Sequence, residues 1–96
     1  MPTYIVFANM TPQGIKTVNE LPQRREAAKV AAKALGITWR DGFVTMGQYD
    51  VVFILDAPDG ETMAKFALQI GMKGNLSTHT MRAFSDAETD ALVGSL

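Results

Sequence analysis

The 96-residue sequence contains no cysteine and only one histidine. The absence of cysteine excludes disulfides, thiolate nucleophiles and thiolate metal ligands, and it suits a reducing compartment, so we expect a cytoplasmic protein. A single imidazole supplies a metal site poorly, because such sites are commonly built from several histidine, cysteine or carboxylate ligands. We therefore predict neither a metal nor a cofactor.

Long apolar runs and an excess of one charge are also missing. No stretch approaches the roughly 18 apolar residues of a membrane span, and the first residues lack the basic segment of a secretory signal. Nine Lys and Arg stand against ten Asp and Glu, which gives a net charge of -1. Because no overall field attracts phosphate backbones or anionic lipids, we expect neither nucleic acid nor membrane as a partner.

Length and composition are those of one small globular domain. The apolar fraction is 47% and the charged fraction 20%, which is ordinary for globular chains. We expect residues 1–96 to form a single domain. At this length roughly 60 to 65% of the unfolded surface can be buried, so oligomerisation is an easy route to further burial.

The order of the predicted elements is βαββαβ, followed by a short helix. Runs of β-forming residues predict strands at 4–8, 37–46, 49–55 and 76–84, and helix-forming periodicity predicts helices at 22–35 and 60–70. The first helix should bury a stripe formed by Ala27, Val30, Ala31, Ala34 and Leu35. The spacing from Ser85 to Glu88 is that of a capping box, which predicts a terminal helix at about 86–93.

Three connections carry further signals. Thr11 and Pro12 can begin a single helical turn inside the long link from Met10 to Leu21. Gly42 indicates a bulge or bend in its strand. Gly47 and Gln48 predict a two-residue type II′ hairpin, with the next strand starting at Tyr49.

Two βαβ units joined by a hairpin predict an antiparallel sheet of order 4-1-3-2, that is, a ferredoxin-like α+β sandwich with both helices on one face. Alternation in the third strand places Tyr49, Val51, Phe53 and Leu55 on one side and Val52 and Ile54 on the other. Both faces are thus apolar, although an open antiparallel sheet normally shows polar residues on its wet side. A second copy is the simplest cover, so we predict a homodimer, a dimeric α+β barrel.

Five local elements, in order, resemble the GYD-domain family over residues 3 to 84. They are Thr11-Pro-Gln-Gly-Ile15, Arg24 with the alanine-rich helix, Thr45-Met-Gly-Gln-Tyr-Asp50, Ala57-Pro-Asp-Gly-Glu-Thr62, and Gly74-Asn75 leading to Thr78-His-Thr-Met-Arg-Ala-Phe84. The Gly-x-Tyr-Asp element gives that family its name. The resemblance implies a small ferredoxin-like domain and brings no assigned activity.

Candidate catalytic residues are Tyr49, Asp50 and His79. Asp50 could accept a proton while Tyr49 orients a substrate, or the two could simply build a hairpin. His79 could be a general base, or it could be structural or solvent-facing, because no partner carboxylate lies at a recognisable spacing. It should lie on the opposite sheet face from Arg82, three residues on.

Candidate ligand-binding residues are Trp39, Tyr49, Asp50 and Thr11. An aromatic such as Trp39 can line a pocket or belong to the core, and Thr11 lies in the long connection, a kind of loop that is often functional. Arg82, with Thr78 and Thr80 in one polar row, either binds an anion or bridges the dimer through an ion pair.

Three functions follow from these patterns. The leading hypothesis is a homodimer that binds a small, partly apolar molecule between sheet and helices or at the barrel ends. One alternative is a cofactor-independent enzyme of the isomerase or monooxygenase type. The other is a structural or protein-interaction dimer.

Overall fold

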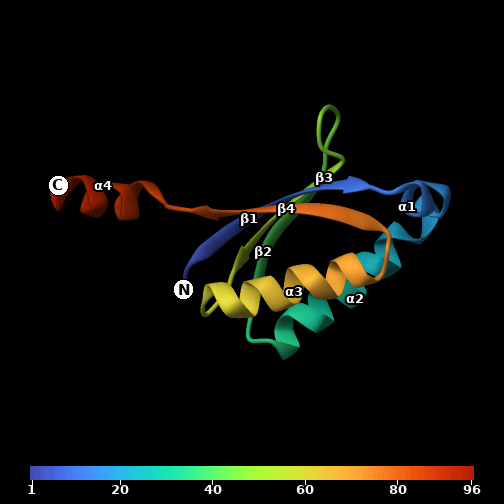
Figure 1. Ribbon diagram of the computed structural model, residues 1–96, viewed down its shortest axis with the longest axis horizontal. Helices are drawn as coiled ribbons and strands as arrows, with labels where there is room; N and C mark the ends of the chain where they lie inside the picture. The colour runs from blue at the N-terminus through green and yellow to red at the C-terminus, as the bar shows by residue number, and fades with distance from the viewer.

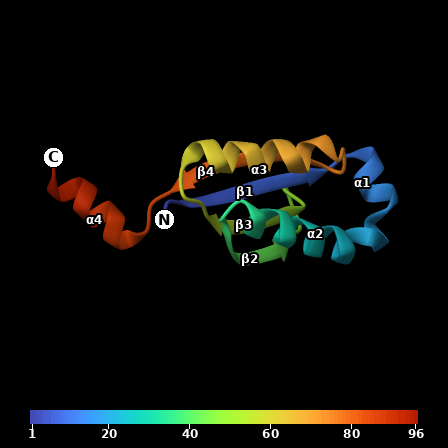
Figure 2. The same ribbon diagram turned by 90° about the horizontal axis from the view of Figure 1, so that it is seen from below.

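The computed structural model describes residues 1–96 as one open antiparallel sheet with two long helices on one side (Figures 1 and 2). The strands are β1 (Thr3–Met10), β2 (Thr38–Val44), β3 (Val51–Asp56) and β4 (Leu76–Ala83). The helices are α1 (Pro12–Lys16), the 3-10 turn η1 (Val18–Glu20), α2 (Leu21–Ala34), α3 (Gly60–Met72) and α4 (Asp86–Gly94). The sheet order β2-β3-β1-β4 confirms the predicted order 4-1-3-2, counted from the other edge.

The core lies between the sheet and the helices α2 and α3. Alternate residues of β1 and β3 face the helices, so Val6 lies opposite Phe53 on this side. Met63 and Phe66 of α3 are buried against them, as the spacing in that helix predicts. The core cluster consists of Val6, Ala32, Ile37, Phe53, Leu55, Ala57, Met63 and Phe66. None of the helices has both the length and the apolar character required to cross a membrane.

The predicted apolar stripe of α2 is wrong at most of its positions. Ala27 and Ala34 are exposed, and Val30 is 70% exposed. Ala32 is buried instead, and Ala28, Ala31 and Leu35 pack against the core. Alanine stands on several sides of this helix, so the sequence gives little contrast between its faces, and packing on the sheet decides the orientation.

The predicted two-residue hairpin is also wrong. β2 ends at Val44 and β3 begins at Val51, so the loop is longer than predicted and projects from the sheet (Figure 1). The loop is closed by a hydrogen bond from the Thr45 amide to the Asp50 carbonyl, 2.8 Å. Asp50 is held towards β1, because its amide donates to the Ala8 carbonyl and its carboxylate accepts from the Met10 amide. This attachment leaves Tyr49 outside the strand alternation, and its ring packs on Phe7.

The irregularity in β2 lies at Arg40 and not at Gly42. The register between β2 and β3 shifts between Trp39 and Asp41, and Gly42 itself pairs with Phe53. Gly42 leaves room for the neighbouring indole, because a Cβ at this position would lie 3.2 Å from the Trp39 ring. A side chain at this position would therefore press against Trp39.

The connection after β1 confirms the predicted helical turn and docks it on the turn between α3 and β4. Thr11 caps α1 by accepting from the Gly14 amide, and its hydroxyl donates to the Gly74 carbonyl at 2.6 Å. Gly14 is in such close contact with Asn75 that a Cβ would clash with the Asn75 carbonyl oxygen. Gly14 thus permits an approach that any other residue would prevent.

The side of the sheet without helices, here called the open face, is apolar at its centre. Register places Ile5 opposite Ile54 and Phe7 opposite Val52 on this side. Phe43 and Met81, on the outer strands, are 51% and 53% exposed. The prediction of two apolar faces is therefore confirmed for β1 and β3, the central strands, whereas the outer strands also place Asp41 and His79 on the open face.

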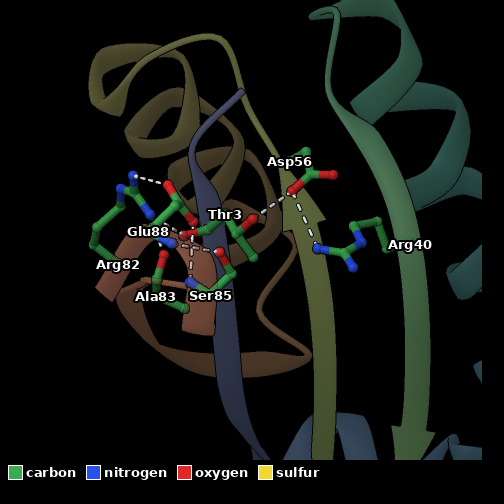
Figure 3. A network of polar contacts seen from close by, with 7 residues as sticks. All are labelled: Thr3, Arg40, Asp56, Arg82, Ala83, Ser85 and Glu88. Atoms are coloured by element: carbon green, nitrogen blue, oxygen red, sulfur yellow. Dashed lines mark hydrogen bonds and ion pairs between the residues drawn. The ribbon is translucent and has the colours of Figure 1, made fainter. Parts of the chain in front are cut away.

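Helix α4 lies apart from the layered body and is tied to it by a polar network (Figures 1 and 3). Arg82 lies 3.4 Å from Glu88, and Glu88 and Ser85 form the predicted capping box. The hydrogen bond from the Ser85 amide, aided by the Arg82 guanidinium, holds the pKa of Glu88 below its usual range. Arg82 thus finds an anionic partner within its own chain.

The same network reaches the other strands at this end of the sheet. Arg82 also donates to the Thr3 carbonyl, and the Thr3 hydroxyl donates to Asp56 at 2.7 Å. Asp56 in turn lies 3.5 Å from Arg40 (Figure 3). These contacts link all four strands, because the four residues in contact, Arg82, Thr3, Asp56 and Arg40, each belong to a different strand.

We expect Gly14→Ala to destabilise the protein by about 1–3 kcal/mol, because the new methyl group must push α1 away from Asn75. Urea denaturation followed by circular dichroism measures the change. Gly71→Ala is the matched control, since Gly71 lies in α3 with open space around it. It should stabilise the protein by about 0.5–1 kcal/mol. Equal stabilities of the Gly14→Ala variant and the wild type would contradict the close packing of α1.

Candidate functional site

A cavity of about 530 Å³ lies between the sheet and helices α2 and α3. Nineteen residues line it, and 13 of them are hydrophobic. The helices contribute Leu21, Arg24, Arg25, Ala28, Ala31, Phe66, Gln69, Ile70 and Met72; the strands and turns contribute Met10, Trp39, Gly42, Phe43, Val44, Val51, Phe53, Lys73, Asn75 and Leu76. Its volume and apolar lining are those of a small-molecule site.

The cavity arises from a contrast in side-chain size. Ala28 and Ala31 of α2 present only methyl groups, while the sheet opposite carries Trp39 and Phe53. The two aromatic rings are stacked, with centroids 4.9 Å apart and planes 11° apart. Short side chains above rigid, stacked rings leave space that neither layer fills.

Charged residues in the cavity lining are all basic. Arg24, Arg25 and Lys73 line it, and no Asp or Glu does. One guanidinium nitrogen of Arg24, Nη2, donates to the carbonyls of Gly14 and Thr17 at 3.2 and 3.1 Å. The Nε–H of Arg24 is buried and has no partner. The lining thus offers a positive region, and the unsatisfied Nε–H lies beneath its surface.

Of the four predicted ligand-binding residues, the structure brings only Trp39 to the cavity. The Trp39 ring packs against the core and also forms part of the cavity wall. Thr11 is engaged in capping α1 and bonding Gly74. Tyr49 packs on Phe7 on the open face, and Asp50 bonds to β1, so neither lines the cavity.

The predicted catalytic residues are only partly brought together. Tyr49 lies against His79 in an edge arrangement, with ring centroids 5.8 Å apart. His79 pairs with Phe7 in the register, on the open face, and is exposed. The Asp50 carboxylate accepts a hydrogen bond from the Met10 amide at 2.8 Å, so its role is structural, but it ties the loop to β1 and does not act within the hairpin.

The relative positions of Arg82 and His79 are a further sequence-based expectation. Arg82 pairs with Tyr4 and lies on the helix side with Thr78 and Thr80, so it is on the opposite face from His79, as predicted. No three His, Asp or Glu side chains gather in a way that could hold a metal ion.

Sequence reasoning did not single out Arg24, Arg25 or Lys73 as cavity residues. Of these three, only Arg24 was named from the sequence, and only as part of the family resemblance. A usable signal was the clustering of basic residues at the start of α2, with one acid, Glu26, among them. Their meeting with Lys73 depends on contacts between segments nearly 50 residues apart, which local patterns do not contain.

Comparisons with known proteins find similarity over nearly the whole chain. Residues 4–93 match the family model described as GYD domain. A protein of Thermus thermophilus named glutamine synthetase and cystathionine beta-lyase binding protein is 29% identical over 89 residues. This match covers 92% of the present chain and 94% of that relative. No solved structure gives a significant match.

We expect Asp50→Ala to lower the free energy of unfolding by about 1–3 kcal/mol, because the Met10 amide loses its acceptor. Asp50→Asn keeps an acceptor oxygen and should cost less than half as much. Chemical denaturation of both variants measures the difference. Asp90→Ala, an exposed carboxylate of α4, is the control and should leave stability nearly unchanged. A fully stable Asp50→Ala variant would argue against the structural role.

Proposed function

The chain belongs to the GYD-domain family, and on that premise we propose that it is a homodimeric binding protein. Two copies join through their open faces as a dimeric α+β barrel, and each copy binds a small, partly apolar molecule in its helix-side cavity. We further propose that residues 1–96 act as a single domain in the cytoplasm, a compartment that suits a cysteine-free chain.

The observation that carries the dimer is the apolar open face. Its centre is formed by two cross-strand pairs, Ile5 with Ile54 and Phe7 with Val52. Only 10 of 96 residues are fully buried in the single chain, and Phe43 and Met81 on this face are 51% and 53% exposed. Burial stabilises by about 25 cal/mol per Å² of apolar area, and covering this face with an identical one adds a second core.

The cavity supports the small-molecule part of the proposal. It holds about 530 Å³, within the range of roughly 300–1,000 Å³ for ligand sites, and its walls are mostly apolar. Polar side chains are few and come from α2, from Gln69 of α3 and from the turn after α3. A ligand with an apolar body and a small polar group fits such a lining.

Binding to other proteins is the second candidate, favoured by the name of the Thermus thermophilus relative. That protein is named for binding glutamine synthetase and cystathionine beta-lyase. An open face made of Ile5, Phe7, Val52 and Ile54 could be covered by a different protein instead of a second copy. The two candidates compete for one surface.

The geometry favours an isomerase or monooxygenase function less. His79 and Tyr49 are in contact, yet they lie on the open face and away from the cavity. The Asp50 carboxylate accepts a hydrogen bond from the Met10 amide. No residue proposed as a proton acceptor therefore faces the space where a substrate would be enclosed.

We expect light scattering at micromolar concentration to give about twice the 10.4 kDa mass of one chain. Val52→Lys should produce monomers, because it puts an ammonium group in the middle of the buried open face. Val30→Lys is the matched control, since Val30 is 70% exposed on α2, and it should stay dimeric.

A monomeric wild type would contradict the dimer. If that monomer bound purified glutamine synthetase or cystathionine beta-lyase, and Val52→Lys abolished the binding, the second candidate would replace the first. If the wild type is dimeric, binds such a partner and loses that binding in the Val52→Lys variant, the partner site lies on the dimer interface.

We expect a screen of small apolar compounds to raise the melting temperature of the wild type, because a ligand that binds only the folded state stabilises it by mass action. Ala28→Leu should remove the increase by filling the cavity. Ala27→Leu adds the same side chain at an exposed position of α2 and should keep it. An increase that survives Ala28→Leu would mean that the compounds bind elsewhere.

A further inference from the structure

We propose that the cavity selects apolar monoanions, of which an aliphatic carboxylate is the simplest; this rests on the small-molecule function proposed above. The anionic head group binds at Arg24, near Arg25 and Lys73, and the apolar body lies over Trp39 and Phe53.

The charge of the cavity lining is the first reason. All three charged lining residues are basic, although the whole chain has more acidic than basic residues. The ion pairs of the chain are Lys29 with Glu26, Arg40 with Asp56 and Arg82 with Glu88. None of them neutralises the cavity, so its positive potential is available to a ligand.

The state of Arg24 is the second reason. Its Nη2 is fixed by the carbonyls of Gly14 and Thr17, and these two bonds hold the guanidinium in place. Its Nε–H is buried without an acceptor, and leaving a buried donor unsatisfied is costly. This donor is closed to the cavity, so a carboxylate there meets the fixed guanidinium through Nη1, the nitrogen that neither carbonyl occupies.

The position of α2 is the third reason. Leu21, Arg24 and Arg25 lie in its first turns and all line the cavity, so both arginines reach it from the start of this helix. Lys73 approaches from the end of α3. Together these groups concentrate positive charge at one end of an otherwise apolar space.

The remaining walls define the body of the ligand. Trp39, Phe53 and Phe66 are aromatic, and Met10, Ile70 and Leu76 are flexible or branched apolar residues. No acidic lining residue is available to hold a cation. A cationic amphiphile of the same length should therefore be rejected, and a neutral one should leave the Arg24 charge without an anionic partner.

Trp39 is the only tryptophan of the chain and lines the cavity, so its fluorescence reports binding directly. The wild type is titrated with decanoate, decan-1-ol and decyltrimethylammonium at concentrations where each is monomeric. We expect decanoate to bind roughly tenfold or more tightly than decan-1-ol, because one charge-assisted hydrogen bond changes the affinity by about that factor. Decyltrimethylammonium should bind the most weakly.

Three variants locate the head group. Arg24→Lys keeps the charge but removes the fixed guanidinium, and it should weaken decanoate binding about tenfold while leaving decan-1-ol unchanged. The double variant Arg25→Gln/Lys73→Gln removes two exposed charges of the lining and should weaken only decanoate. Lys33→Gln, the matched control, removes a charge from an exposed position of α2 outside the cavity and should leave both affinities unchanged.

The double variant keeps the test decisive if Arg24→Lys does not fold, because the side chains of Arg25 and Lys73 donate no hydrogen bond within the chain. Equal affinities of the wild type for decanoate and decan-1-ol would overturn the selection of anions while preserving a small-molecule cavity. An equal loss in Lys33→Gln would show nonspecific attraction and would also overturn it. No binding of any of the three compounds would overturn both the inference and the small-molecule function.

Discussion

The structure depends on one constraint: a four-stranded sheet has two faces, and this sequence makes both of them apolar while supplying helices for only one. Alternate residues of β3 divide between the faces, with Phe53 buried under the helices and Val52 on the open face. With few residues buried in the single chain, the helix side cannot by itself hold all the apolar surface that the strands present. In the proposed dimer, the second copy covers the face that the helices leave open.

Small residues set the spacing of the other layer. Ala32 of α2 is buried against the sheet, which requires a close approach, whereas Ala28 and Ala31 of the same helix face the aromatic pair Trp39 and Phe53 across a cavity. The close contact of Gly14 with Asn75 fixes the segment that leads into α2. The start of α2, and with it Arg24, is thereby positioned by a contact of the connection with the α3–β4 turn.

The sequence predicts what local patterns encode. β-forming runs, caps and turn residues predicted the strand order, α3 and the Ser85 capping box, and alternation placed His79 and Arg82 on opposite faces. Prediction from the sequence failed where the contact that decides the structure joins residues far apart in the chain. Tyr49 leaves the strand pattern because Asp50 is bonded to Met10, and that bond joins residues 40 positions apart.

The cavity could not be predicted for the same reason. Alanine on several sides of α2 gives almost no contrast between faces, so the sequence misplaced its buried stripe. Trp39 was recognised as a cavity or core residue from its type, but the space beside it depends on which alanines lie opposite. The unsatisfied Nε–H of Arg24 appears only once Gly14 and Thr17 have occupied another nitrogen of the same group.

The two proposed binding surfaces use the two faces of one sheet and therefore do not compete. β3 contributes Val51 and Phe53 to the cavity and Val52 and Ile54 to the open face. Arg25 and Lys73, which line the cavity, come from the helix layer and are exposed, so covering the open face leaves them accessible. A ligand in the cavity still touches the strands that meet in the dimer, because neighbouring residues of β3 share one rigid backbone. The shortest link between ligand binding and association therefore runs through β3 and its partner β2, the strand that carries Trp39 on the cavity side and Phe43 beside Val52.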